Sequence, residues 1–204
     1  MAGRPKGTGG QATMLAQNEI QRVNRWLAST RYEHRNRAIF FLGLGSGMRI
    51  SEIVGLLIKD VMPYDEILDA IVLEKHRTKS KHSRTVFITE QARHFLQIYL
   101  DKRRQSEMLN VNSPLFPSQK NPRQPLSANA ATHLLRKILA EAGVANASSH
   151  SMRRTHGNTL RRNGADLKLI QEQLGHASIQ TTAIYFSVTP EERKNAIKNM
   201  KFKT

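Results

Sequence analysis

The amino-acid sequence predicts a mainly α-helical domain that contains a small antiparallel β-sheet, an α+β fold. Apolar residues recur at helical spacing through most of the 204 residues. Two runs rich in β-branched residues, 68–75 and 84–89, are separated by a short charged stretch that we interpret as a hairpin loop. The composition is 39% apolar, enough for a hydrophobic core, and no internal repeat is present. We therefore expect one large domain over residues 17–204.

Three helices are predicted before the sheet. In residues 17–29 the apolar side chains recur on one face. Residues 35–45 are apolar nearly all round, which is typical of a helix buried on several sides. The run Gly45-Ser46-Gly47 is expected to end this helix. A shorter helix, 50–57, follows with its apolar residues turned inward.

Further helices follow the sheet. Ser127 is a suitable N-cap and Gly143 a suitable stop for one of them. The run Thr189-Pro190-Glu191-Glu192 combines a capping box with proline at the first helical position. We predict helices at residues 90–104, 127–142, 151–163, 166–174 and 178–186, and a C-terminal helix from Thr189.

The net charge of the chain is +16, from 32 Lys and Arg residues against 16 Asp and Glu residues. Cationic side chains that neutralise phosphates release condensed counterions, so a polyanion is the leading partner. Nucleic acid comes first and an anionic membrane surface second, while composition alone leaves a generic basic protein open. Aromatic residues are only 6% of the chain, which favours contact with the backbone of a duplex over stacking on single-strand bases.

Residues 1–16 are predicted to form a flexible basic arm. The first twelve residues hold four glycines and show no apolar periodicity. The run from Gly3 to Gly7 resembles part of an AT-hook, and a disordered tail without specific contacts is the alternative. Under either interpretation, Arg4 and Lys6 on a mobile arm would strengthen binding to DNA.

Several classes of protein are excluded by what the sequence lacks. Without cysteine there is no disulfide framework, zinc knuckle or thiol nucleophile. No run of eighteen apolar residues and no signal-peptide core is present, so we expect a soluble cytoplasmic protein, associated with the nucleoid and not with a membrane. No P-loop motif is present, and the sixteen acidic residues are too scattered for a two-metal nuclease. We expect neither a metal ion nor a cofactor.

The second half of the chain carries an unusual set of polar residues. His150 and Arg153 are three residues apart, hence on one face near a helix start. Gly175 suits the left-handed turn that ends a helix, and His176 follows it. Tyr185 lies nine residues after His176.

Upstream, Arg49 lies at a glycine-marked helix junction, three residues before Glu52. Two arginines, two histidines, a tyrosine and a lysine-rich hairpin loop suit phosphoryl transfer at a diester without a metal ion. With these residues the chain resembles the tyrosine recombinases, which include phage integrases and Xer-type resolvases. The matching motifs occur in family order over roughly residues 17–200: G-M-R-I-S-E (47–52), T-K-S-K (78–81), H-S-M-R-R-T-H (150–156), L-G-H (174–176) and T-T-A-I-Y (181–185).

The resemblance implies the tyrosine-recombinase catalytic-domain fold over residues 17–204, with a C-terminal helix. It also implies a metal-independent, site-specific DNA recombinase that cleaves and rejoins duplex DNA through a 3′-phosphotyrosyl intermediate and a Holliday junction. Type IB topoisomerases share this chemistry, but L-G-H followed by T-T-A-I-Y is more similar to the recombinases. Integration, excision, inversion and resolution stay open, as does the target site. The competing hypothesis is a non-catalytic DNA-binding protein that has kept the fold.

The resemblance assigns a role to each residue of the set. Tyr185 is the expected nucleophile, which attacks the scissile phosphate and releases a 5′-hydroxyl. Arg49 and Arg153 would hold the non-bridging oxygens, for which the planar, permanently charged guanidinium is suited. His150 would take part in proton transfer with the tyrosine, and His176 would donate a hydrogen bond to the phosphoryl oxygens.

The remaining assignments concern the hairpin loop and two supporting residues. Lys79 resembles the family's general acid, which protonates the departing 5′-oxygen, although Lys75 and Lys81 lie in the same loop and spacing alone does not separate the three. Glu52 is expected to orient Arg49 or a histidine through a charge-paired hydrogen bond. His156 occupies a position where the family commonly has an aromatic residue, and we interpret it as a packing residue.

In one respect the chain departs from the family. Most members carry an N-terminal core-binding domain of about a hundred residues, whereas here about sixteen residues precede the first predicted helix. The chain is therefore a compact member that has the catalytic domain only, the interpretation we favour, or a fragment of a longer protein. As partners we expect double-stranded DNA, a homotetramer on synapsed sites, a monomer or weak oligomer when free, and accessory DNA-bending proteins.

Overall fold

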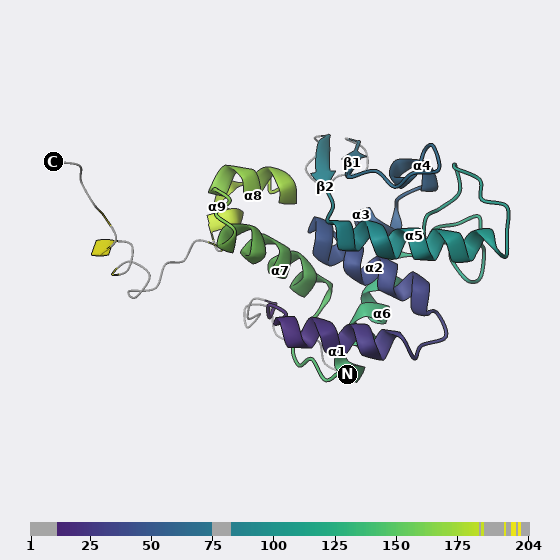
Figure 1. The fold of residues 1–204 in the computed structure, drawn as a ribbon, viewed down its shortest axis with the longest axis horizontal. Coiled ribbons are helices and arrows are strands. Elements are labelled where there is room, and N and C mark those ends of the chain that lie inside the picture. The colour runs from purple at the N-terminus through teal and green to yellow at the C-terminus, as the bar shows by residue number, and fades with distance from the viewer. Residues whose placement is uncertain are drawn as a thin grey trace.

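The computed structural model describes residues 12–74, 83–183, 185, 194, 197, 198 and 200. This part of the chain is mainly helical with one two-stranded antiparallel sheet, which confirms the predicted fold class (Figure 1). The elements in chain order are α1 (Gln17–Leu27), α2 (Glu33–Ser46), α3 (Ile50–Val54), α4 (Ile58–Val61), β1 (Ala70–Leu73), β2 (Arg84–Phe87), α5 (Glu90–Arg104), α6 (Ala128–Glu141), α7 (Ser149–Arg162), α8 (Leu167–Leu174) and α9 (Ile179–Ala183). None of the described helices is long and apolar enough to cross a membrane.

The predicted elements that fall within the described residues have counterparts in the structure, with small shifts at their ends. Helix α4 is not predicted, because a single turn of four residues is too short to show an apolar period. Both strands are shorter than the predicted runs. The predicted C-terminal helix from Thr189 lies outside the described residues except for positions 194, 197, 198 and 200.

Helix α2 forms the centre of the molecule. Its residues 38–42 are at most 2% exposed, as expected from their unbroken apolar sequence. In Figure 1, α1 lies below this helix, α5 lies above it and α7 lies to its left. Phe41 of α2 stacks on Phe95 of α5, with ring centroids 4.1 Å apart. Burial of this apolar surface is the main force that holds the helices together.

Three glycines at the C-terminal end of α2 allow its neighbours to approach closely. A Cβ atom at Gly43 would lie 2.8 Å from a side chain of α7, and one at Gly45 would lie 2.8 Å from a side chain of α5. Gly47 caps the helix with a φ of +65°, and a Cβ atom there would lie 2.6 Å from a side chain of α8. The residues that follow Gly47 are therefore held at the meeting point of three helices.

The two strands form a short hairpin against the helical core. Ala70 pairs with Phe87 and Leu73 with Arg84. Val86 faces the core and is fully buried, whereas Phe87 is 62% exposed, so successive side chains of β2 alternate between core and surface. The hairpin thus presents one apolar face outward.

Side-chain caps set the start of helices α7 and α8. The hydroxyl of Ser148 accepts a hydrogen bond from the main-chain N–H of His150 at 3.3 Å, so that His150 lies in the first turn of α7. The carboxylate of Asp166 caps α8 in the same way. Gly175 ends α8 with a φ of +65°, which is the left-handed turn expected there.

The end of the predicted basic arm contacts α7. Within residues 12–16, the main-chain N–H of Leu15 donates a hydrogen bond to a threonine hydroxyl of α7 at 2.9 Å, and its side chain is 5% exposed. The first eleven residues, which include Arg4 and Lys6, lie outside the described residues.

Candidate active site

A cleft of about 300 Å³ lies between the start of α3, helix α7 and the segment that follows α8. It is lined by Ala12, Arg49, His150, Arg153, Arg154, His176, Thr181 and Tyr185. The cleft thus brings together five of the six residues predicted to be catalytic. The sixth, Lys79, lies outside the described residues, as do Lys75 and Lys81. Among the residues that the structure describes, no group of three His, Asp or Glu side chains could hold a metal ion.

Arg49 and Glu52 form one unit at the start of α3. The carboxylate of Glu52 accepts hydrogen bonds from the main-chain N–H of Arg49 at 2.8 Å and from its guanidinium at 3.0 Å. Arg49 also donates to the carbonyl of Gly175 at 3.2 Å. The Glu52 side chain is only 2% exposed, whereas that of Arg49 is 23% exposed and lines the cleft. The sequence predicts that Glu52 orients either Arg49 or a histidine, and these hydrogen bonds join it to Arg49.

Glu52 has a second partner, Arg84 of β2, which the sequence analysis did not identify. The two guanidinium nitrogens of Arg84 donate to the two carboxylate oxygens at 3.0 and 2.8 Å. Burial raises the pKa of Glu52, but the hydrogen bonds and charges of Arg84 and Arg49 outweigh burial and hold that pKa below its usual value. Glu52 is therefore an ionised carboxylate shared by two arginines.

Arg153 is buried in the wall of the cleft, with 7% of its surface exposed. It donates hydrogen bonds to the carbonyls of Gly47 and Leu174, both at 2.7 Å. Burial, together with the charge of Arg49, lowers the pKa of Arg153 to about 10, so the side chain remains charged at neutral pH. Because these acceptors are neutral carbonyls, they leave its positive charge available to an anion.

His176 and Tyr185 face each other across the cleft. Nδ1 of His176 lies 2.7 Å from the hydroxyl oxygen of Thr182. Burial, followed by the charges of Arg153 and Arg49, lowers the pKa of His176 to about 4, so its imidazole is neutral at pH 7. The rings of His176 and Tyr185 are nearly parallel, with centroids 6.2 Å apart.

Tyr185 is 6% exposed and lies against the backbone of α7. A Cβ atom at Gly157 would lie 3.0 Å from the tyrosine ring, so a side chain there would press against the ring in this position. Burial raises the pKa of Tyr185, and the charges of Arg153 and Arg154 oppose that effect without cancelling it. The phenol is therefore protonated at neutral pH and must lose its proton before it can act as a nucleophile. His150 is exposed at the rim of the same cleft.

Behind the cleft, His156 and Gln173 connect several elements. His156 is 8% exposed, as its interpretation as a packing residue requires, and its Nδ1 lies 2.8 Å from the carbonyl oxygen of Leu44. The amide of Gln173 donates to the carbonyls of Ser46 at 3.0 Å and Phe87 at 2.8 Å, and accepts from the main-chain N–H of Phe87. Gln173 thus ties α8 to both α2 and β2, although a glutamine within a helix carries no sequence signal of such a role.

The buried histidine predicts a loss of stability in mild acid. Burial lowers the pKa of His156 to about 4 from an ordinary value of 6.5. As the pH falls from 6.5 to 4, the unfolded chain takes up a proton that the folded chain does not, so the free energy of unfolding falls by up to about 3 kcal/mol.

Urea unfolding at several pH values checks this expectation. His156→Phe should flatten the pH dependence, although His176 continues to contribute because its pKa is shifted the same way. The exposed His133 of α6 provides the matched control, His133→Phe. Equal pH dependence in the wild type and His156→Phe would contradict the assignment.

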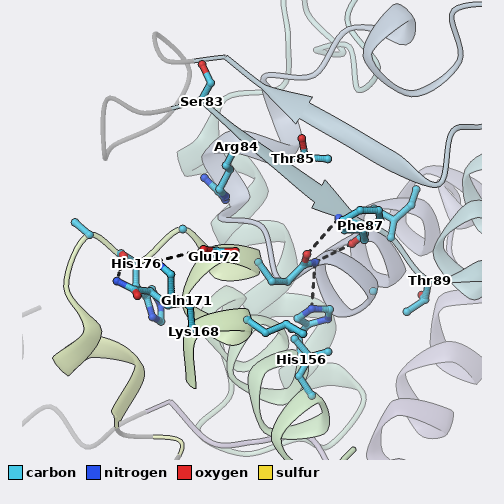
Figure 2. A pocket seen from close by; sticks show the side chains of 17 residues that line it. Ser83, Arg84, Thr85, Phe87, Thr89, His156, Lys168, Gln171, Glu172 and His176 are labelled. Atoms are coloured by element: carbon cyan, nitrogen blue, oxygen red, sulfur yellow. Dashed lines mark hydrogen bonds and ion pairs between the residues drawn. The ribbon is translucent and has the colours of Figure 1, made fainter. Parts of the chain in front are cut away.

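A second, larger groove of about 800 Å³ lies between β2 and α8 (Figure 2). Arg84 and Phe87 border it from the strand, and Lys168 and Glu172 border it from the helix. Phe87 is 62% exposed, and Leu169, which also lines the groove, is 49% exposed. The groove therefore offers apolar surface with charged residues at its edge.

Among curated proteins, the chain is 30% identical over 185 residues to the tyrosine recombinase XerD of Oceanobacillus iheyensis, covering 89% of this chain and 60% of XerD. It is 31% identical over 165 residues to the tyrosine recombinase XerC of Bacillus subtilis, covering 79% of this chain and 52% of XerC. The chain thus spans between half and three fifths of the length of these relatives.

Among solved structures, the chain is similar to the XerA recombinase, with a TM-score of 0.74 and 25% identity over 95% of this chain and 68% of XerA. It also shares the fold of the Tn1549 transposon integrase in complex with circular intermediate DNA. That comparison has a TM-score of 0.73 and 18% identity, over 96% of this chain and 69% of the integrase.

The fold is that of a tyrosine-recombinase catalytic domain. The chain belongs to the phage integrase family, whose family model matches residues 13–192. The family predicted from five short motifs is thereby confirmed.

Proposed function

We propose that this chain is a site-specific DNA recombinase that cleaves and rejoins duplex DNA through Tyr185. The observation that carries the proposal is the gathering of Tyr185, two arginines and two histidines in one cleft. Simple binding of DNA would not require a tyrosine that is packed beside two cationic side chains. A structural relative supports DNA as the substrate, since the XerH site-specific recombinase has been solved bound to its difH substrate.

In the proposed reaction, the phenolic oxygen of Tyr185 attacks the scissile phosphorus. A phosphorus–oxygen bond to tyrosine forms while the bond to the 5′-oxygen breaks, which leaves a 3′-phosphotyrosyl link and a free 5′-hydroxyl. Arg49 and Arg153 hold the two non-bridging oxygens, and each such contact stabilises the transition state by about 3 to 4 kcal/mol. Attack by a 5′-hydroxyl of a second strand reverses the step, and exchange in two rounds passes through a Holliday junction.

Two proton transfers accompany the exchange of bonds. With an ordinary pKa of about 10, a phenol is ionised to about one part in a thousand at pH 7, a deficit of about 4 kcal/mol. We propose that His150 takes this proton as the phosphate enters and that neutral His176 donates a hydrogen bond to a phosphoryl oxygen. Lys79 is proposed to protonate the departing 5′-oxygen, with Lys75 and Lys81 as alternatives. Neither a metal ion nor a nucleotide cofactor takes part.

The remaining positive charge would position the flanking duplex. We propose that the basic arm, with Arg4 and Lys6, adds contacts to the duplex and that accessory DNA-bending proteins assist assembly. The protein would then act in the cytoplasm, at the nucleoid. The biological outcome is set by the arrangement of target sites.

A suicide substrate tests the proposal. Duplexes taken from the DNA that flanks the gene are nicked so that the strand fragment carrying the new 5′-hydroxyl diffuses away after cleavage and the covalent adduct accumulates. We expect a protein–DNA adduct that survives denaturation, is linked at Tyr185 and forms equally well in the presence of a chelator. Specific binding to a duplex without any adduct, or a requirement for a divalent cation, would overturn the proposal.

For the assembly, we propose a homotetramer on synapsed sites in which the groove between β2 and α8 receives the C-terminal segment of a second copy. The groove presents exposed Phe87 and Leu169. In the C-terminal segment, Ile197 is 68% exposed and Met200 is 54% exposed, so their own chain does not bury them. Lysines of the segment would meet Glu172 at the rim of the groove.

Polar substitution in the segment should weaken assembly without affecting binding of one subunit to DNA. Burying an apolar side chain contributes about 1.5 to 3 kcal/mol, so Ile197→Asp is expected to weaken tetramer formation about tenfold or more. Sedimentation of protein–DNA complexes measures the effect. Leu169→Asp should weaken assembly equally, whereas Met108→Asp, at a 98% exposed position, serves as the matched control. An unchanged tetramer in both Ile197→Asp and Leu169→Asp would contradict this docking.

A further inference from the structure

The carboxylate of Glu52 has more cationic partners than it can neutralise. Its two oxygens accept four hydrogen bonds, two from Arg49 and two from Arg84. Four acceptor positions are all that a carboxylate offers. One negative charge is thus divided between two guanidinium groups, and the three side chains together carry a net charge of +1.

The two arginines occupy different places around this carboxylate. Arg49 lines the cleft that holds Tyr185, whereas Arg84 lines the groove between β2 and α8. The side chain of Arg84 is 10% exposed, and Figure 2 places it on β2 next to the turn that carries His176. Arg84 itself does not line the cleft that holds Tyr185.

Arg84 also packs against the turn after α8. A Cβ atom at Gly175 would lie 2.6 Å from the guanidinium carbon of Arg84, so the absence of a side chain at Gly175 makes room for Arg84. The carbonyl of the same Gly175 accepts a hydrogen bond from Arg49. Arg84 thus contacts both groups that hold Arg49 in place, the carboxylate of Glu52 and the turn at Gly175.

We propose that Arg84 is a positioning residue of the active site, which takes up part of the charge of Glu52 and so leaves Arg49 free to hold a phosphate oxygen. The inference rests on the proposed function. Without Arg84, both carboxylate oxygens would turn to Arg49, and their bidentate pair would be neutral. The phosphate would then have to compete with Glu52 for the guanidinium of Arg49.

The proposal predicts a rescue that a purely structural role does not. Arg84→Met should lower the single-turnover rate of cleavage of the suicide substrate by about 10- to 100-fold, the range seen when a partner of a directly acting residue is lost. Adding Glu52→Gln to Arg84→Met removes the negative charge and returns the net charge to +1. The double variant should therefore recover at least about tenfold in rate. Arg84→Lys keeps the positive charge but lacks the planar pair of donors of the guanidinium. Its cleavage rate should therefore lie between those of the wild type and Arg84→Met.

A second measurement needs no catalysis. Tungstate, a tetrahedral oxyanion, is titrated into the free protein while the amide resonance of His176 in the cleft is followed by NMR. Arg84→Met should weaken binding about tenfold, and the double variant should restore it. Arg104→Met is the matched control, because Arg104 pairs with Asp65 far from the cleft. All variants are compared at a temperature at which each is folded.

The outcomes separate the two proposals. Wild-type behaviour of Arg84→Met in both measurements overturns the inference, and so does an impaired Arg84→Met whose rate and tungstate affinity Glu52→Gln fails to improve. Failure of the wild type to cleave any DNA overturns the proposed function, and the tungstate series then decides the role of Arg84 by itself.

Discussion

Tyr185→Phe is expected to abolish the covalent protein–DNA adduct completely. The substitution removes only the hydroxyl oxygen that would attack the phosphorus. The remaining ring can keep its place beside Gly157 and His176, because the close contacts recorded there involve ring atoms. Binding of DNA and the free energy of unfolding should therefore change little. Denaturing gels of the suicide-substrate reaction measure the adduct, and binding is measured on the uncleaved duplex.

Tyr64→Phe supplies the comparison for the loss of a phenolic oxygen, since Tyr64 is 90% exposed and outside the cleft. This variant should form the adduct at the wild-type rate. An adduct that persists in Tyr185→Phe would show that another residue is the nucleophile.

Arg153→Ala is expected to lower the rate of cleavage by roughly 10²- to 10³-fold, the usual effect of removing one donor to a developing oxyanion. The structure adds a second consequence. The guanidinium of Arg153 is hydrogen bonded to the carbonyls of Gly47 and Leu174, so its loss leaves two acceptors without their partner and should lower stability by about 1 to 3 kcal/mol for each. Rates must therefore be measured well below the melting temperature of the variant.

Arg103 offers a control for the loss of stability that comes from removing an arginine bonded to two main-chain carbonyls. It also donates to two main-chain carbonyls, those of Pro114 and Leu115, at 3.1 and 3.0 Å, but it lies outside the cleft. Arg103→Ala should lower the melting temperature, although by less because the Tyr99 hydroxyl still donates to the carbonyl of Leu115, and should leave the cleavage rate of the folded protein unchanged. If Arg153→Ala loses DNA binding and cleavage together while remaining folded, Arg153 has no special role in the chemical step.

The sequence predicted well those features that depend on local pattern. The unbroken apolar run of α2 indicated a helix buried on several sides, and Gly175 indicated the turn that ends α8. Motifs far apart in the chain indicated the residues that meet in the cleft. Their individual roles stay predictions, and Lys79 lies outside the described residues.

Other features depend on contacts that no local pattern records. Arg84 begins an ordinary strand, and only the folded chain brings it to Glu52, 32 residues earlier. Gln173 looks like any polar helix residue until its amide is seen to bridge α2 and β2. A residue that positions a catalytic side chain without lining the cleft belongs to no sequence motif, because only the tertiary structure brings it close to the site.

In the proposed recombinase, the position of Tyr185 bears on which subunit would cut which strand. The tyrosine rests against Gly157 of its own chain, in the cleft that its own Arg49 and Arg153 line. A subunit with this arrangement has no need to borrow a nucleophile from its neighbour, so cleavage is expected to proceed in cis. In the proposed assembly, the order of cutting would then depend on the contacts that move the nearly buried phenol toward the phosphate. Contacts between subunits would regulate the timing of that movement and would not complete the catalytic set.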